Sequence, residues 1–568
     1  MQMQTFYAPL AIYFILTLSV VPAHGQTATP DQQLSARVDS IFSPYARSDA
    51  PGCAVSVMKA GKILYARGYG MADVAHSIPL TPATPFIIAS TTKPFTALAV
   101  LLLEKEGKLR LDDDVRKYVP EVPNFGHPIT IRMLLNHTSG LRELHNLFNL
   151  AGWRNSDVQL KEDVFYMIRR QRALNHAPGA EFAYNSTGYT LLAIVVERVS
   201  GVSFSSFVND RIFTPLGMTH SYVEESINQV IPHRATGYWG HDPAKLRTTR
   251  PVNSFPGPNG IVTSVEDLAR WDENFYRHRV GTPAILNQMS TPNRLTDGTE
   301  FGYGLGFFIG THRGRRTVSH AGSDYGYKAD FIRFPAEQLT VAVLCNAFDI
   351  PPTPLALQVA DLYLPPPTPS AEASPMPSVV GVGASENPAN FAGRYWSDAQ
   401  RRLGPRVVYE NGKLLIDGGG EGMFELRPLG NNSYRLTAAP RRLIFTFVRR
   451  AGAVEVQVDR EGSPLAKYRK VTESKPTAAV LRSLEGNYFS PELDVTWKFV
   501  VRDGALVLER RWTDPSPLSA VFGKVFVAPD GFVLEFSLDL TRRRWIVEIS
   551  TERARRVRFV RVAENGCR

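Results

Sequence analysis

Apolar residues recur at helical spacing directly after one serine in the first fifth of the chain. Phe95, Leu98 and Leu102 repeat every three to four positions, which is the spacing of residues on one face of a helix. Gly107 follows this run, where a left-handed C-terminal cap is expected. The pattern predicts a helix that starts near Ser90 and ends before Gly107.

The last third of the chain has a different pattern, with a period of two. Valines alternate with polar residues over 454–459, and apolar and polar residues alternate again over 534–539. This period is typical of half-buried antiparallel strands. The region is therefore predicted to be all-β.

The all-β region also repeats itself. Residues 391–397 (FAGRYWS) resemble residues 484–490 (LEGNYFS), and the matching glycines are offset by 486 − 393 = 93 positions. The hairpin dipeptides Asn411-Gly412 and Asp503-Gly504 follow with an offset of 504 − 412 = 92. Two related units of about 90 residues are expected, each closing as a small antiparallel barrel because closure removes exposed strand edges.

Composition adds a charge imbalance and few cysteines. The net charge is +10, and from residue 390 onward 31 Lys and Arg stand against 21 Asp and Glu. A solvated barrel exterior explains this excess, although an anionic cell-envelope surface is a possible partner. Nucleic acid is not an expected partner, because no recognition motif is present. The three cysteines Cys53, Cys345 and Cys567 are too few for a disulfide framework.

The N-terminal residues 1–25 are expected to be a signal peptide. An apolar stretch from Ala8 to Val21 is followed by small residues at Ala23 and Gly25. We therefore predict a secreted or periplasmic protein. No later segment has the ~20 apolar residues of a membrane helix, so no transmembrane helix is expected after cleavage.

The predicted helix start carries a candidate nucleophile. Ser90 precedes Lys93 by three residues, which places the hydroxyl and the amine on one helical face. The amine can accept the hydroxyl proton if burial lowers its pKa. A serine cap beside a snorkelling lysine gives the same pattern, so this segment alone leaves both interpretations open.

Two other segments supply what acyl transfer through Ser90 would need. Tyr184-Asn185-Ser186 offers a phenol that can act as a general acid or base. His320-Ala321-Gly322-Ser323 combines an imidazole with small residues that allow close approach to a substrate. His137, in the turn-like segment LNHTSGL, is expected to be structural. No metal-ligand spacing and no cofactor motif occur, so neither metal nor cofactor is implied.

Together these segments resemble the serine β-lactamase and penicillin-binding-protein superfamily, in its class C-like branch. The resemblance spans about Gly52 to Leu364 and includes GYGMADV, GKLRLDDDVRKYVP, GPNGIVTSVEDLARW and FGYGLGF in the family's order. It implies an α/β (α+β) β-lactamase/transpeptidase-like domain, with a central antiparallel sheet flanked by helices. With the two lipocalin-like barrels, the architecture is similar to that of D-aminopeptidases. The expected domains are a signal peptide (1–25), a catalytic domain (26–364), a Pro/Ser/Ala-rich linker (365–389) and two barrels (390–475 and 476–568).

The resemblance also assigns roles to residues. Ser90 would be the nucleophile, Lys93 and Tyr184 a coupled proton-transfer pair, and His320 an assisting group. The backbone N–H groups of Ser90 and Ser323 would form the oxyanion hole.

Substrate contacts are expected from Asn185, Ser186 and Gly322. Two positions depart from the family pattern: His320 stands where many relatives have the lysine of K-T-G, and Ser186 stands where Y-x-N has asparagine. These changes favour acylation of Ser90 over ordinary β-lactam turnover.

In the family's fold, the strand that holds Cys53 pairs with the strand that holds Cys345. Two buried thiols are the expected state of these cysteines, because a disulfide has strict geometric requirements. A bridge between them is the alternative.

The predicted function is that of a serine hydrolase that cleaves small peptide, amide or ester substrates through an acyl-Ser90 intermediate. Peptides with D-residues, such as cell-wall fragments, are the preferred substrate class. β-Lactamase or carboxylesterase activity is the first alternative. A non-catalytic receptor or binding module with the same fold is the alternative of another class.

Overall fold

The structure is a computed structural model of the 568-residue chain. It describes residues 30–366, 386–418, 422–436, 443–450, 452–460, 464–511 and 513–563. The predicted signal peptide, Cys567 and most of the predicted linker lie outside the described residues. The predicted domain boundaries stay predictions.

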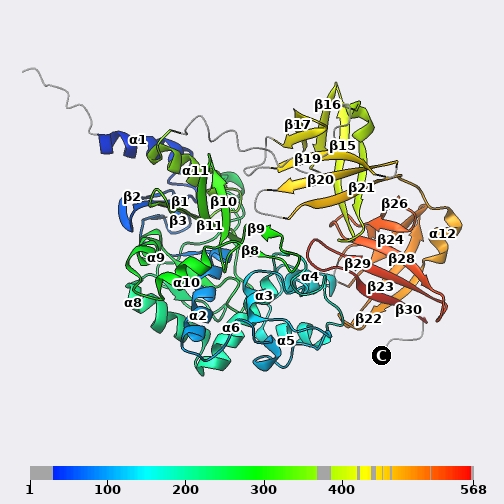
Figure 1. Cartoon of the computed structure of the whole chain (residues 1–568), viewed down its shortest axis with the longest axis horizontal. Helices are drawn as coiled ribbons and strands as arrows, with labels where there is room; N and C mark the ends of the chain where they lie inside the picture. Colours follow the sequence, from blue (N-terminus) through cyan, green and yellow to red (C-terminus); the bar gives the residue numbers. More distant parts are fainter. Residues whose placement is uncertain are drawn as a thin grey trace, which may run out of the picture.

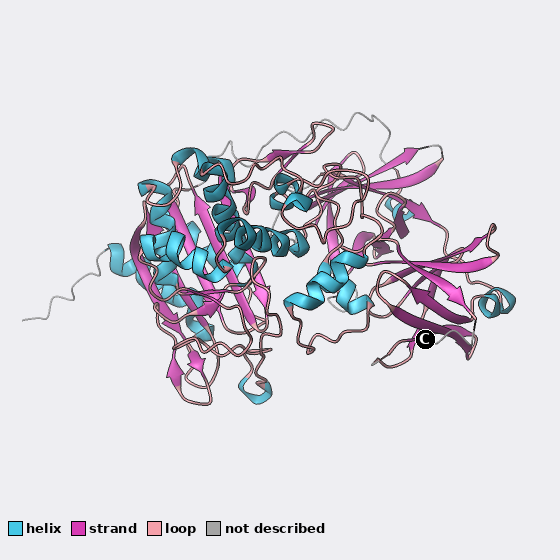
Figure 2. Cartoon of the chain, turned by 90° about the horizontal axis from the view of Figure 1, so that it is seen from below, coloured by secondary structure: helices cyan, strands magenta, loops and turns pink. Residues whose placement is uncertain are grey.

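The N-terminal half is built around one antiparallel sheet with the strand order β10-β11-β12-β13-β1-β2 (Figure 1). Figure 2 shows helices on both sides of this sheet, and a part built mostly of strands at the other end of the molecule. This arrangement confirms the predicted fold class. The strands of the sheet are β1 (Cys53–Lys59), β2 (Lys62–Tyr69), β10 (Phe308–His312), β11 (Arg315–Asp324), β12 (Tyr327–Phe334) and β13 (Leu339–Cys345).

Helices α1 (Pro30–Phe42) and α11 (Pro352–Tyr363) pack together over one face, where α11 contacts β12 and β13. Helix α9 (Val265–Arg277) packs against β1, β2 and β13 from the other face. The remaining helices of this half are α2 (Lys93–Lys105), α3 (Ile131–Leu135), α4 (Leu144–Leu150), α5 (Lys161–Arg170), α6 (Ser186–Ser200), α7 (Phe204–Val208), α8 (Thr214–Leu216) and α10 (Pro283–Met289).

Short elements join these layers. Single turns are η1 (Ser43–Tyr45), η2 (Ala89–Thr92), η3 (Val115–Lys117), η4 (Asn209–Phe213), η5 (Pro243–Lys245) and, before the barrels, η6 (Pro388–Phe391). Short strands are β3 (Met71–Asp73), β4 (Ile78–Pro79), β5 (Phe86–Ile87), β6 (Tyr222–Val223), β7 (Ile261–Thr263), β8 (Asn293–Arg294) and β9 (Glu300–Phe301).

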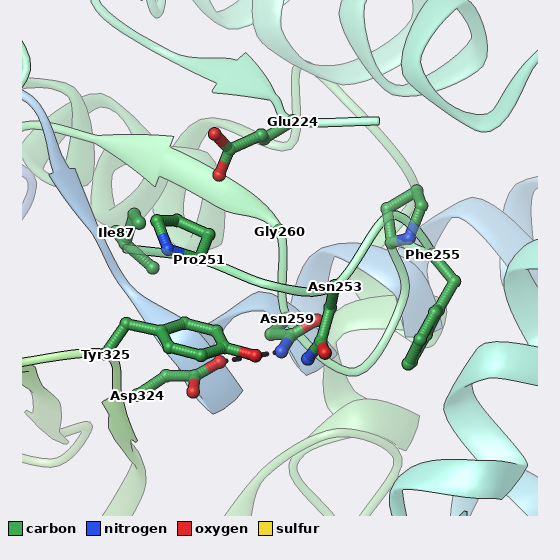
Figure 3. A pocket seen from close by; sticks show the side chains of 10 residues that line it. Ile87, Glu224, Pro251, Asn253, Phe255, Asn259, Gly260, Asp324 and Tyr325 are labelled. Carbon is green, nitrogen blue, oxygen red and sulfur yellow. Dashed lines mark hydrogen bonds between the residues drawn. The ribbon is translucent and has the colours of Figure 1, made fainter. Parts of the chain in front are cut away.

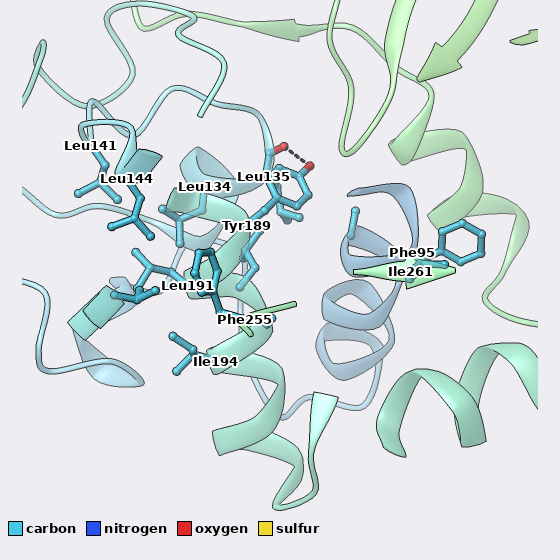
Figure 4. Packing of buried hydrophobic residues seen from close by; sticks show 14 of the residues in the cluster. Phe95, Leu134, Leu135, Leu141, Leu144, Tyr189, Leu191, Ile194, Phe255 and Ile261 are labelled. Atoms are coloured by element: carbon cyan, nitrogen blue, oxygen red, sulfur yellow. Dashed lines mark hydrogen bonds between the residues drawn. The ribbon is translucent and has the colours of Figure 1, made fainter. Parts of the chain in front are cut away.

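The core between α2, α3 and α6 positions the segment that carries Ser90. Phe95 of α2 and Leu191 of α6 are completely buried, and Figure 4 shows them within the same apolar cluster. The Tyr189 hydroxyl donates a hydrogen bond to the Leu135 carbonyl oxygen at 2.7 Å, which ties α6 to the end of α3. The helix predicted after Ser90 is confirmed, and Gly107 adopts the expected positive φ of 71°.

Cys53 and Cys345 form a disulfide, so the expectation of two free thiols is wrong. The two residues face each other in the antiparallel pairing of β1 with β13, with Cα atoms 4.0 Å apart. Strand register brings the side chains to the same face, and sequence spacing alone does not reveal that register.

The first barrel closes on itself, as predicted, through pairing of β14 with β21. Its interior is an apolar cluster that includes Phe391, Tyr395 and Phe447. The strands are β14 (Gly393–Ser397), β15 (Arg402–Glu410), β16 (Lys413–Asp417), β17 (Met423–Gly430), β18 (Ser433–Leu436), β19 (Leu443–Arg450), β20 (Ala453–Arg460) and β21 (Ala466–Val471).

The second barrel follows helix α12 (Ala478–Ser483) and is nearly closed. Its sheet runs in the order β25-β24-β23-β22-β30-β29-β28-β27-β26, and no pairing joins β25 to β26 within the described residues. The strands are β22 (Gly486–Ser490), β23 (Val495–Arg502), β24 (Ala505–Glu509), β25 (Ser516–Pro517), β26 (Ser519–Phe522), β27 (Val525–Val527), β28 (Val533–Asp539), β29 (Arg544–Ser550) and β30 (Val557–Val562).

The sequence repeat corresponds to equivalent positions in the two barrels. Strands β14 and β22 begin at the matching glycines 393 and 486. The tyrosine two residues later donates a hydrogen bond to a backbone carbonyl four residues earlier in both units, at 2.8 Å for Tyr395 and 2.9 Å for Tyr488. Both predicted hairpin dipeptides have positive φ, between 49° and 79°, as a type I′ turn requires.

Among the described residues, no single helix is long and apolar enough to span a membrane. The segments Ser186–Ser200 and Phe204–Leu216 are together long and apolar enough, but the chain bends by 81° between them.

Candidate active site

Ser90 lies in the single turn η2, directly before helix α2. The Lys93 Nζ atom donates a hydrogen bond to Ser90 Oγ at 3.0 Å. Ala89, the residue before Ser90, has a φ of 47°, a region that non-glycine residues adopt at a cost. The predicted pair of hydroxyl and amine is therefore in contact, on a turn with a strained backbone.

Lys93 is completely buried. Burial lowers the pKa of its amine to about 7, while the charges of Glu143 and Asp324 raise it and that of Arg553 lowers it further. The amine also donates a hydrogen bond to the Pro258 carbonyl oxygen at 3.0 Å. Near neutral pH a large fraction of Lys93 is thus uncharged and able to accept a proton.

Tyr184 lies against this amine. The Lys93 Nζ atom is 4.8 Å from the centroid of the Tyr184 ring. Desolvation raises the pKa of Tyr184, and the interaction of its hydroxyl with Ser90 opposes that rise. The phenol is therefore protonated at neutral pH and positioned to donate rather than to act as a phenolate.

His320 and Gly322 lie on β11, which packs against η2. The Thr91 hydroxyl donates a hydrogen bond to the His320 carbonyl oxygen at 3.1 Å. A Cβ atom at Gly322 would lie 2.1 Å from the Ile88 carbonyl oxygen, so only glycine permits this approach. Ser323 follows directly and lines the same cavity as Ser90.

The His320 ring is buried, and both of its nitrogens have neighbours. Its Nδ1 atom is 2.7 Å from the Ala321 carbonyl oxygen, and its Nε2 atom is 3.3 Å from the Tyr303 hydroxyl. These contacts fix the ring orientation at the edge of the cavity.

The two residues after Tyr184 have different environments. The Asn185 side chain caps α6 by accepting from the Gly188 N–H at 2.9 Å, and its amide donates to the Leu141 carbonyl oxygen at 2.7 Å. Ser186 lines the cavity, and its N–H donates to the Glu143 carboxylate at 2.5 Å. Both hydrogen bonds of the Asn185 side chain are thus to backbone groups. Its predicted contact with the substrate stays a prediction.

The His137 ring packs against the Tyr184 ring. Its Nδ1 atom accepts a hydrogen bond from the Asn185 N–H at 3.1 Å, and its ring centroid lies 4.4 Å from that of Tyr184. Burial lowers the pKa of His137 well below its usual value, and the charge of Lys93 lowers it further. A neutral packing histidine results. No cluster of three His, Cys, Asp or Glu side chains in the described parts of the chain could hold a metal ion.

Ser90, Tyr184, Ser186, His320, Gly322 and Ser323 all line one cavity of about 750 Å³. Asp324 also lines it and accepts a hydrogen bond from the Asn259 amide at 2.7 Å. Figure 3 shows this pair beside Tyr325. Burial raises the pKa of Asp324 to about 7, while Asn259 and the charge of Lys93 oppose the rise.

Sequence reasoning missed Asp324, Glu143 and Arg553. Asp324 directly follows the His320–Ser323 segment, so its position was a usable indication. Glu143 follows LNHTSGL closely, but its contact with Ser186 depends on the fold. Arg553 comes from the second barrel and lines the cavity of Ser90, which no local pattern reveals.

The family model described as Beta-lactamase matches residues 38–363, more than half of the chain. This chain belongs to the Beta-lactamase family. The match covers every element from β1 to α11, and with them Ser90, Tyr184 and His320.

Similar proteins include penicillin-binding proteins. Penicillin-binding protein 4* of Bacillus subtilis (strain 168) is 31% identical over 412 residues, which are 69% of this chain and 89% of that protein. Protein flp of Staphylococcus aureus (strain N315) is 31% identical over 310 residues, 52% of this chain and 59% of that protein. The chain thus spans less than two thirds of the length of protein flp.

Among solved structures, the octameric penicillin-binding protein homologue from Pyrococcus abyssi is similar with a TM-score of 0.52 and 25% identity. The alignment covers 77% of this chain and 99% of that chain. The aligned 77% is a larger part of this chain than residues 38–363 are. The structural similarity therefore extends into the C-terminal region.

Proposed function

We propose that this protein is a serine hydrolase that cleaves amide or ester bonds through an acyl-Ser90 intermediate. The observation that carries the proposal is the 3.0 Å contact between Lys93 Nζ and Ser90 Oγ, with the Lys93 pKa lowered to about 7. A neutral amine beside a hydroxyl is what activation of a serine nucleophile needs.

In the proposed reaction, neutral Lys93 takes the Ser90 proton while the oxygen attacks the substrate carbonyl carbon. The backbone N–H groups of Ser90 and Ser323 stabilise the oxyanion. Tyr184 lies against Lys93 and passes a proton to the leaving group, which departs as the acyl-enzyme forms. Lys93 then returns the proton taken from Ser90 to Tyr184. A water molecule attacks the acyl carbon and gives a proton to the Lys93–Tyr184 pair, which protonates Ser90 Oγ as the bond between this oxygen and the acyl carbon breaks and the product acid leaves.

The proposed substrates are peptides with D-residues or cell-wall-derived peptides, with simple esters and β-lactams as less favoured alternatives. The similarity to penicillin-binding protein 4*, which is named for binding penicillin, supports a ligand with an amide carbonyl group. The cavity of about 750 Å³ is large enough for a short peptide segment.

We also propose that the protein acts outside the cytoplasm. The Cys53–Cys345 disulfide supports this proposal, because disulfides persist in oxidising compartments. Finding the mature N-terminus near residue 26 in the secreted or periplasmic fraction is the expected result, and a cytoplasmic protein starting at Met1 would contradict it.

The catalytic proposal is tested with a fluorophosphonate label followed by peptide mass spectrometry. An adduct on Ser90 is expected, with none in the Ser90→Ala variant, whose folding is checked by circular dichroism. Absence of the adduct in folded wild-type protein would favour a non-catalytic binding module instead. Turnover of D- and L-aminoacyl amides, D-alanyl-D-alanine peptides, short esters and a cephalosporin then distinguishes the substrate classes.

A further inference from the structure

The turn between β29 and β30 of the second barrel brings one arginine into the cavity of Ser90. Arg553 lines this cavity. Its guanidinium carbon lies 5.8 Å from the centroid of the Tyr184 ring. A positive charge from the C-terminal barrel therefore stands beside the proposed proton-transfer pair.

Hydrogen bonds to backbone atoms fix the turn to the N-terminal half of the chain, which carries Ser90 and is called the catalytic half from here on. The Arg553 carbonyl oxygen accepts hydrogen bonds from the Glu143 N–H at 3.0 Å and the Asn175 side-chain amide at 2.8 Å. Asn175 also accepts from the Arg555 N–H at 2.7 Å. The Cα position of Arg553 relative to Tyr184 is thus set before any substrate binds.

A buried ion pair reinforces this attachment. Arg142 pairs with Glu492, and their side chains are 1% and 5% exposed. The same guanidinium donates to the carbonyl oxygens of Arg555 and Arg556, at 3.0 Å each. Arg142 lies in the catalytic half, whereas Glu492, Arg555 and Arg556 lie in the second barrel. Arg142 therefore links the turn to the catalytic half.

The Arg553 charge is only weakly compensated. Its ion partner is the neighbouring Glu552, which is 71% exposed and lies 3.7 Å away, beyond hydrogen-bond distance. An exposed pair of this kind contributes little. The Arg553 side chain is itself 38% exposed, so a solute in the cavity can reach it.

The other basic groups of the cavity are less suited to holding an anion. His145 lines the cavity, and burial lowers its pKa. His320 is not permanently charged, and its ring nitrogens contact Ala321 and Tyr303. Lys328 has its ammonium 4.1 Å from the Phe348 ring centroid, and burial lowers its pKa. Arginine, by contrast, stays charged and matches a carboxylate with two parallel N–H groups.

We propose that Arg553 is a specificity-determining residue of the Ser90 site, which recognises a carboxylate on the substrate near the scissile bond. This inference rests on the proposed function for its kinetic consequence, but the binding site can be tested without turnover. It assigns the second barrel a direct part in substrate selection.

The binding test uses the full chain with Ser90→Ala and isothermal titration calorimetry. For a carboxylate on the leaving-group side, N-acetyl-D-alanyl-D-alanine is compared with its C-terminal amide. For the acyl side, N-succinyl-D-alanine amide is compared with N-butyryl-D-alanine amide. We expect one carboxylate ligand to bind about tenfold tighter than its neutral partner, as a charge-assisted hydrogen bond allows.

Arg553→Gln should remove this preference, and Arg553→Lys should keep part of it. Arg556→Gln is the matched control, because Arg556 is an exposed arginine of the same turn outside the cavity lining and loses the same charge. An equal preference in wild-type and Arg553→Gln proteins, or no binding of either carboxylate ligand, would overturn the proposal. The ligand that shows the preference identifies the side of the scissile bond.

The kinetic test compares mono-p-nitrophenyl glutarate with p-nitrophenyl butyrate on the enzyme with Ser90 intact. Arg553→Gln should lower kcat/KM for the glutarate about tenfold relative to the butyrate if the acyl side carries the carboxylate. Equal losses on both esters would indicate a merely structural arginine. If fluorophosphonate does not label Ser90, the hydrolase proposal is wrong. Calorimetry then still shows whether Arg553 binds a carboxylate.

Discussion

At the residue scale, the chemistry depends on one buried amine. Lys93 is completely buried, 3.0 Å from Ser90 and 3.0 Å from the Pro258 carbonyl oxygen. Burial is the main cause of its lowered pKa of about 7, and the nearby carboxylates of Glu143 and Asp324 limit the effect. The same amine in water has a pKa of about 10.4 and could not act as a base at neutral pH.

The first prediction concerns pH. Because neutral Lys93 is the active form, kcat/KM should fall about tenfold per pH unit below pH 7 and level off above it. Glu143→Gln removes a negative charge that raises the Lys93 pKa, so the rising limb should move to lower pH. The pH dependence of Ser90 phosphonylation by a fluorophosphonate measures this limb, and a flat profile between pH 5 and 8 would contradict the assignment of Lys93 as base.

At the element scale, two contacts assemble the site. Strand β11 approaches η2 at Gly322, where the Ile88 carbonyl oxygen leaves no room for a side chain. The β29–β30 turn contacts Arg142 in the segment after α3 and Asn175 in the segment after α5. Each contact depends on a close fit between elements that are distant in the sequence.

Gly322→Ala should therefore separate β11 from the nucleophile. The new Cβ atom meets backbone, which cannot rotate away as a side chain could. A shift of about 1 Å at Ser323 should lower the rate of Ser90 acylation about 100-fold. Circular dichroism should remain close to wild type, and an unchanged acylation rate would show that β11 does not position the oxyanion hole.

Glu492→Ala should lower the free energy of unfolding by disrupting the attachment of the second barrel. It leaves the Arg142 charge buried without its partner, which costs about 3–5 kcal/mol, and denaturant unfolding followed by tryptophan fluorescence measures the loss. Asp494→Asn is the matched control, since asparagine tolerates the φ of 59° at this position. The ion pair of Asp494 with Arg170 is partly exposed and should contribute at most about 1 kcal/mol. Equal effects of the two changes would contradict a special role for the buried pair.

At the scale of the whole molecule, covalent and apolar links hold distant parts together. The disulfide joins residues separated by 292 positions, near the two ends of the catalytic half. Apolar residues of the second barrel, including Tyr488 and Trp497, belong to the same buried cluster as Phe95 and Leu191. The first barrel has its own cluster and meets the second through Trp396, Val525 and Val533.

Reduction of the disulfide should destabilise the catalytic half by about 2–4 kcal/mol, because the unfolded chain regains freedom. Unfolding midpoints with and without reductant measure the change, and a Cys53→Ala/Cys345→Ala variant should show no response to reductant. Thiol titration of the denatured, non-reduced protein should find fewer than three free cysteines, because Cys53 and Cys345 are bridged. Three free thiols would contradict the bridge.

The sequence by itself determined the features that depend on near neighbours. The helix after Ser90, the alternating strands and the repeat of the two barrels follow from spacings of a few residues, because helices and strands impose fixed periods on the chain. The segments around Ser90, Tyr184 and His320 were recognisable for the same reason.

Only the tertiary structure decided the features that depend on desolvation and long-range register. The lowered pKa of Lys93 needs the complete burial that the fold provides. The Cys53–Cys345 bridge needs the register of β1 with β13, and Asn185 became a helix cap through contacts with α6 and Leu141. Arg553 enters the cavity because hydrogen bonds such as that with Asn175, 378 positions earlier, hold its turn there, and no local pattern encodes that distance.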